Sequence, residues 1–307
     1  MGWRWGGRAA KMSRTVSRLA SMPVLTPKQA LQLSVVVALA TCVLKGLAAW
    51  LTGSVAYFSD AVESLVNVAG AAFALAMVHY ASQPADAGHP YGHGKAEYFS
   101  AAFEGGMIFL ASLAILASAA ERLANPRPVE ALGWSTLLAA TASLANFAVA
   151  RILLRTARAH RSIAAEADAR HLATDVLTTA GVIVGVALAV VSGQSWLDPA
   201  IAIAVALNIL REGWLLLRRS IDGLMDHALG PDDLERLRAA LDAELVEGSR
   251  YIGLRTRRAG TMSFAFLTLR VPGDWSVARA HAAADLMENA ARRLGVTLAT
   301  HIEPDAR

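Results

Sequence analysis

The chain has 307 residues, of which 55% are hydrophobic and 18% are charged, and its formal net charge is +4. This composition is too apolar for an ordinary soluble domain and indicates a membrane protein. The single cysteine, Cys42, excludes an intrachain disulfide and a cysteine-rich metal cage. The excess positive charge lies beside the apolar segments, so nothing calls for a nucleic-acid partner.

The chain begins with a basic stretch, residues 1–29, that contains Trp3 and Trp5 among several arginines. It lacks the apolar core of a secretory signal peptide. We therefore expect a cytoplasmic tail that contacts anionic lipid.

Six apolar segments follow, each close to the roughly 20 residues that a helix needs to cross a bilayer. They run near Leu31–Leu51, Val55–Tyr80, Phe99–Ala120, Leu132–Leu154, Ala173–Val191 and Trp196–Leu217. Lysines and arginines gather before the first segment, between the fourth and fifth, and after the sixth. Because positive loops stay in the cytoplasm, both termini should be cytoplasmic, with residues 30–220 forming a six-helix domain in the cell (inner) membrane.

Two pairs of polar residues lie in the apolar segments or at their edge, Glu63 with Asn67 and His171 with Asp175. Four-residue spacing places both members of a pair on one helix face. An ionised side chain at the bilayer centre costs at least about 2.5 to 3.5 kcal/mol, so each needs a partner, a proton or an ion. The pattern favours an intramembrane metal site on two facing helices; hydrogen bonding between helices is the alternative.

The loop between the second and third segments is rich in metal ligands. Asp86, His89 and His93 fall within eight residues, and neighbouring glycines permit tight backbone turns. Three such ligands could hold one tetrahedral ion, whereas solvated side chains are the alternative.

Residues 221–307 have the composition of a small soluble domain, and the expected order of elements is helix, strand, strand, helix, strand. Phe264, Phe266 and Thr268 alternate along the second strand and should share one face. At this size the core is thin, so pairing with a second copy is a reasonable source of stability.

Several motifs recur in an order that resembles the cation diffusion facilitator family, most nearly its bacterial zinc and iron exporters. They are Gly53-Ser54-Val55, Ser59 to Leu65, Pro90 to Glu97, His171 with Asp175, Trp196 to Ala200, Leu224-Met225-Asp226, Leu254 to Arg257, and His301 to Pro304. The resemblance covers about residues 30 to 304.

The resemblance implies an α-helical membrane protein with six transmembrane helices and a cytoplasmic, metallochaperone-like (ferredoxin-like) α+β domain, assembled as a homodimer. Its transport site would comprise Glu63, Asn67, His171 and Asp175. Relatives usually carry Asp or His at position 63 and Asp at position 67, so the two departures leave the metal open. A loop site would comprise Asp86, His89 and His93.

A third site, in the C-terminal domain, is implied at His281, His301 and Glu303. Ile252 and Thr268 stand where relatives carry histidine, so a full two-metal centre is not expected. Lys95 and Asp226 match a pair that forms a charge interlock in relatives, with two solvated surface charges as the alternative.

The expected function is proton-coupled antiport that exports a divalent transition-metal ion from the cytoplasm. The ion is substrate and no cofactor is expected; Zn²⁺ is favoured, with Fe²⁺, Co²⁺, Mn²⁺ and Cd²⁺ as alternatives. Metal binding needs neutral histidine and ionised carboxylates, so protons leave as the ion arrives. A metal-selective channel without proton coupling is the alternative. A metalloenzyme is not expected, because the chain lacks a His-Glu-x-x-His helix.

Overall fold

The computed structural model of the chain describes residues 24–52, 55–125, 134–194 and 196–305. Within them, six helices are long and apolar enough to cross a membrane, as predicted. They are α2 (Pro27–Thr52), α3 (Val55–Ala81), α4 (Ala96–Ala124), α5 (Trp134–His160), α6 (Ile163–Ser192) and α7 (Leu197–Leu224). Most of the predicted basic tail, residues 1–23, lies outside the described residues.

Several helix ends differ from the prediction, and α7, for example, continues to Leu224 instead of ending near Leu217. Helix α5 continues to His160, and α6 begins at Ile163 instead of near Ala173. Hydropathy marks only the apolar part of a helix, whereas backbone hydrogen bonds continue through polar residues. The chain turns at Arg161, which has a positive φ of 55°. The hydroxyl of Ser162 then caps α6 by accepting from the backbone N–H of Ala165.

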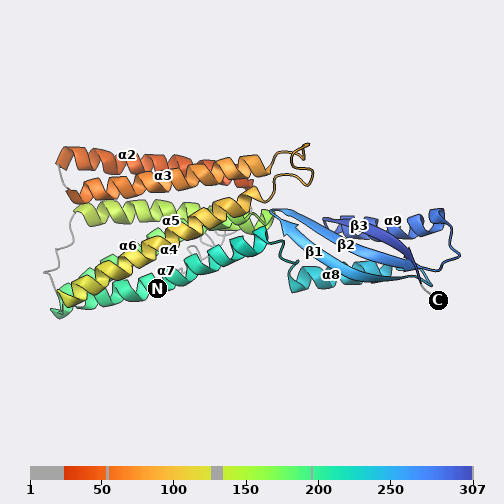
Figure 1. Cartoon of the computed structure of the whole chain (residues 1–307). Coiled ribbons are helices and arrows are strands. Elements are labelled where there is room, and N and C mark those ends of the chain that lie inside the picture. Colours follow the sequence, from red (N-terminus) through yellow and green to blue (C-terminus); the bar gives the residue numbers. More distant parts are fainter. Residues whose placement is uncertain (1–23, 53–54, 126–133, 195, 306–307) are drawn as a thin grey trace, which may run out of the picture.

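The helices form two packing groups that share α6 (Figure 1). Leu31, Val78, Leu153 and Leu172 join one buried cluster built by α2, α3, α5 and α6. A second cluster joins α4, α6 and α7, where Ala167 of α6 is buried. Helix α6 therefore lies between the two groups.

Small residues let α4 and α7 approach closely, side by side in Figure 1. A Cβ added at Gly213 would lie 2.9 Å from the backbone nitrogen of Phe109, and one at Gly105 would lie 3.1 Å from that of Leu217. Close backbone packing through glycine is a common way for membrane helices to associate.

A smaller C-terminal domain lies beyond one end of the bundle (Figure 1). It contains α8 (Pro231–Ala243), β1 (Arg250–Ala259), β2 (Met262–Val271), α9 (Val277–Arg293) and β3 (Val296–Pro304). The sheet order is β1-β2-β3, with β1 antiparallel and β3 parallel to β2. The predicted order of elements and the fold class are confirmed.

The two faces of this sheet differ in what covers them. Leu267 and Leu269 of β2 are fully buried in one cluster with Leu237 and Leu241 of α8 and Met287 of α9. The intervening β2 residues, including the predicted Phe264 and Phe266, point to the other face, and Phe266 is 43% exposed. That second face is not covered by a helix in the described part of the chain.

The glycine contact between α4 and α7 gives a stability prediction. Gly213→Ala should destabilise the protein by about 1–3 kcal/mol, because overpacking against the α4 backbone outweighs the helix propensity that alanine adds. Gly106→Ala on α4 is the matched control, since nothing lies within 4 Å of a Cβ there. Thermal denaturation of the purified protein in detergent measures both; equal midpoints for the two variants would refute the close contact.

Candidate functional site

Polar side chains from α3 and α6 meet within the membrane helices. The Asn67 amide nitrogen donates to Oδ2 of Asp175 over 3.0 Å, and Nε2 of His171 lies 3.1 Å from Oδ1 of Asn67. Glu63 belongs to α3, one turn before Asn67, but its side chain lies outside the described residues. The structure therefore brings together Asn67, His171 and Asp175 of the predicted transport site.

Asn67 connects the other two groups of this cluster. With its amide oriented this way, the oxygen accepts from His171 Nε2–H while the NH₂ group donates to the Asp175 carboxylate. The same atoms, the imidazole Nε2, the amide oxygen and the carboxylate oxygen, are ligands for a small divalent ion. An ion entering here would replace hydrogen bonds that these groups now make to one another.

A further carboxylate, not singled out from the sequence, reaches the same cluster from α4. Glu104 is 0% exposed, and its Oε2 lies 3.4 Å from Nδ1 of His171. The sequence signal was a single acid inside an apolar segment, which usually marks a functional position. Asp168 of α6 is also buried, 2% exposed, but it lies before the predicted fifth segment and carried no such signal. Neither residue was selected, because neither has an acidic, amide or histidine side chain four residues away.

The loop between α3 and α4 holds a second cluster. Nε2 of His93 lies 3.0 Å from Nδ1 of His89 and 3.3 Å from Oδ2 of Asp86. Among the described residues, this is the one group of three or more His, Cys, Asp or Glu whose ligand atoms all lie within 4.8 Å of each other. A hydrogen bond from the backbone N–H of His89 is the main cause that lowers the pKa of Asp86. An ionised carboxylate and two imidazoles suit a tetrahedral ion with one open position.

The three residues predicted for a C-terminal site are not assembled. His301 and Glu303 lie on β3 with Nε2 and Oε1 3.4 Å apart. His281 lies on α9, where its Nε2 is 3.7 Å from Asp285, and no cluster of the described residues joins the three.

The sheet register shows which metal ligands are missing from the described C-terminal sheet. Ile252 pairs with Thr268 across β1 and β2, and Thr268 pairs with His301 across β2 and β3. The three positions thus form one row across the sheet, and only His301 in it can bind a metal.

Charged residues connect the membrane helices to the C-terminal domain. Nζ of Lys95, just before α4, lies 3.0 Å from Oδ1 of Asp226, which also accepts from Arg257 of β1. The hydrogen bond from Lys95 is the main cause that lowers the pKa of Asp226. The predicted pair is therefore an ion pair, and Arg257 extends it to the sheet.

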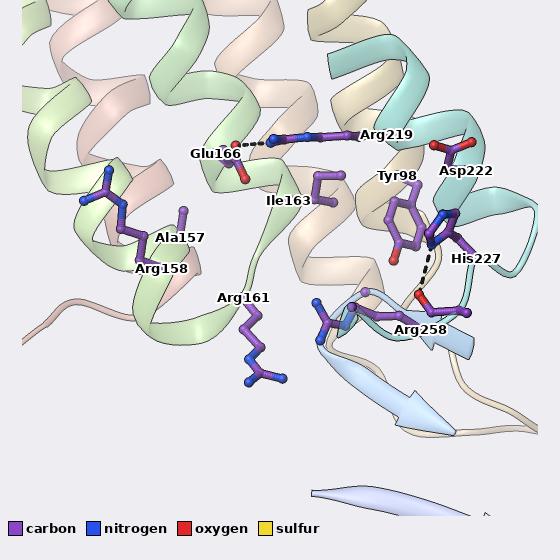
Figure 2. Close-up of a pocket in the computed structure, with 14 residues that line it drawn as sticks. Tyr98, Ala157, Arg158, Arg161, Ile163, Glu166, Arg219, Asp222, His227 and Arg258 are labelled. Carbon is purple, nitrogen blue, oxygen red and sulfur yellow. Dashed lines mark hydrogen bonds and ion pairs between the residues drawn. The ribbon is translucent and has the colours of Figure 1, made fainter. Parts of the chain in front are cut away.

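A cavity of about 400 Å³ at this junction has four arginines in its lining and two acids, Glu166 and Asp222, so its net charge is positive (Figure 2). Arg219 pairs with Glu166 at 2.9 Å, while Arg161 and Arg258 both pair with Asp233 of α8. Figure 2 shows the side chains of Arg158 and Arg161 pointing in different directions. A positively charged lining repels a divalent cation, so we assign no metal to this cavity.

Comparison with known proteins identifies the family. Residues 31–225 match the cation efflux transmembrane domain, and residues 229–305 match the cytoplasmic domain of cation efflux proteins. The chain belongs to the cation diffusion facilitator family. It is therefore a multi-pass membrane transporter for cations and not an enzyme.

Relatives cover nearly the whole of this cation efflux protein. An uncharacterized transporter, sll1263, of Synechocystis sp. is 47% identical over 276 residues, which is 89% of this chain and 88% of the relative. The cation-efflux pump FieF of Shewanella oneidensis is 31% identical over 84% of this chain and 86% of its own length. FieF of Pectobacterium atrosepticum is 32% identical over 87% of this chain and 89% of its own length.

The loop cluster of this transporter gives a binding prediction. His89→Ala should remove about one Zn²⁺ equivalent per chain, because two ligands hold the ion far more weakly than three. His281→Ala is the control, since His281 belongs to no such cluster. Titration calorimetry on the purified proteins measures the stoichiometry, and an unchanged zinc count in His89→Ala would contradict a loop site.

Proposed function

We propose that this transporter exports a divalent transition-metal ion, preferably Zn²⁺, from the cytoplasm in exchange for protons. The ion would bind between α3 and α6 to Glu63, Asn67, His171 and Asp175. The observation that carries the proposal is the convergence of Asn67, His171 and Asp175 from two membrane helices within hydrogen-bond distance.

The preference for zinc rests on the chemistry of these ligands. One imidazole nitrogen, two carboxylates and one amide oxygen form an intermediate to hard set that zinc accepts. The imidazole favours zinc or iron over manganese, whereas the amide favours harder ions. Fe²⁺, Co²⁺, Mn²⁺ and Cd²⁺ are therefore the competing substrates.

The surroundings of His171 support the proposed proton exchange. Its Nε2 faces the Asn67 carbonyl oxygen and its Nδ1 faces the Glu104 carboxylate, so both ring nitrogens lie beside acceptors. A protonated ring suits such a setting, and a metal ion can bind Nε2 only after the proton there has left. When the site faces an acidic exterior, reprotonation of the ring would help to release the ion.

Alternating access would depend on α6, which belongs to both packing groups of the membrane domain. Rocking of one packing group against the other around a fixed midplane site is a common mechanism in transporters. Helix α6 carries His171 and Asp175 and contacts both groups, so such a movement would open the site to either side. The lysines and arginines before α2, between α5 and α6, and after α7 favour a cytoplasmic position for both termini.

Dimerisation would use the sheet face that bears Phe264 and Phe266. Helices α8 and α9 leave this face uncovered in the described chain, and Phe266 is 43% exposed. Apolar surface of this kind favours a second copy of the chain as its partner.

Transport by Asp175→Ala is the main test. This variant loses a carboxylate ligand, so proteoliposomes containing it should lose at least about nine-tenths of the Zn²⁺ flux, and the accompanying proton flux should fall equally. Asp285→Ala, on the exposed face of α9, is the matched control. Unchanged zinc flux in Asp175→Ala would refute the site.

The same vesicles separate an antiporter from a channel. A pH gradient alone should drive zinc against its concentration gradient in the wild-type protein. A channel would dissipate the zinc gradient and could not build one.

Asn67→Asp tests the basis of metal choice. The change removes the neutral amide, which favours harder ions, so we expect the preference for Zn²⁺ over Mn²⁺ to rise by about tenfold, which corresponds to about 1.4 kcal/mol. Competition assays with both ions on the purified protein measure the ratio. The same ratio in Asn67→Asp and wild type would contradict a role of Asn67 in selection.

A further inference from the structure

Glu104 is a buried acid that the proposed set of four ligands does not use. It lies in α4, is fully buried, and neither carboxylate oxygen has a hydrogen-bond partner among the described residues. A buried carboxylate without such a partner is costly in an apolar helix, and an acid at such a position usually has a function.

The carboxylate lies on the opposite edge of the His171 ring from the transport ligands. Nε2 of His171 points to Asn67, whereas Nδ1 lies 3.4 Å from Oε2 of Glu104. The two ring nitrogens project from different edges of the imidazole. Glu104 therefore contacts the edge of the imidazole that does not face Asn67.

A glycine on α3 provides the space for this carboxylate. A Cβ added at Gly70 would lie 3.1 Å from Oε1 of Glu104 and 3.2 Å from Cε of Met107. The Glu104 side chain is thus confined between α3 on one side and α6 on the other. This confinement keeps its second oxygen beside His171.

We propose that Glu104 is a positioning residue of the transport site, accepting the Nδ1–H of His171 so that Nε2 is presented to the metal ion. The inference rests on the proposed function. Histidines that bind metals almost always donate their other ring N–H to a carboxylate, a carbonyl or water, and this bond fixes the tautomer and the ring orientation. Since Glu104 belongs to α4, the bond also ties the site to the packing group of α4 and α7.

Zinc affinity of Glu104 variants tests the proposal. Full-length protein carries Asp86→Ala and His89→Ala throughout, so that the loop cluster does not contribute. Glu104→Leu should bind Zn²⁺ about 10–100-fold more weakly, the usual loss for such a partner. Glu104→Gln should lose less, because its amide oxygen can still accept from Nδ1–H.

Glu97→Gln is the matched control on the same helix. Glu97 is also a buried acid of α4, but its carboxylate accepts from the hydroxyl of Ser162 and the backbone N–H of Ala164 at the start of α6. This variant should lower thermal stability and leave zinc affinity unchanged. Equal affinities of Glu104→Leu, Glu104→Gln and wild type would overturn the proposal.

The visible spectrum of bound Co²⁺ separates positioning from direct ligation. At saturating Co²⁺, the band positions of Glu104→Leu should match those of the parent protein, because its metal ligands are unchanged. Shifted bands would show that Glu104 is itself a ligand and would overturn the positioning role. A parent protein that binds neither ion would overturn the proposed function itself, and this inference with it.

Gly70→Ala provides an independent variant if Glu104→Leu does not fold. The added methyl displaces the Glu104 carboxylate, so zinc affinity should fall, by less than in Glu104→Leu. In the Glu104→Gln background the same change should cost less than it does alone, because the two substitutions act through one contact. Fully additive losses would contradict the proposal.

Discussion

The membrane domain depends on one constraint, that polar side chains within apolar helices must satisfy each other or an ion. Asn67, His171 and Asp175 meet this constraint together, because the asparagine amide donates to one neighbour and accepts from the other. Their hydrogen bonds hold α3 against α6 when no ion is bound. The groups that join the two helices are thus the same groups that we propose as ligands of the transported metal.

Helix α6 connects this cluster to the rest of the molecule. It contributes to both buried clusters of the membrane domain, and Arg170, next to His171, pairs with Glu166 and with Glu212 of α7. Glu166 in turn pairs with Arg219 beside the junction cavity. A continuous set of ion pairs therefore runs from Arg170, next to His171, to Arg219 of α7 beside the junction cavity.

The two regions outside the bilayer contribute differently. The loop before α4 assembles three ligands, and His93 in it is buried against the ring of Tyr80. The C-terminal sheet has only His301 in the row where further ligands would be needed. Its well-packed helical face and exposed second face suit a role in assembly more than in metal binding.

The sequence by itself determined the six spans, the order of elements in the C-terminal domain, and the pairs four residues apart, because hydropathy and helical spacing are local properties. It also grouped Phe264 with Phe266 on one strand face. Only the tertiary structure showed that this face points away from the helices, because α8 and α9 pack against the opposite face of the sheet. The role of Glu104 also depended on the tertiary structure. Its contact, His171, lies 67 positions away on α6, and only helix packing brings the two residues together.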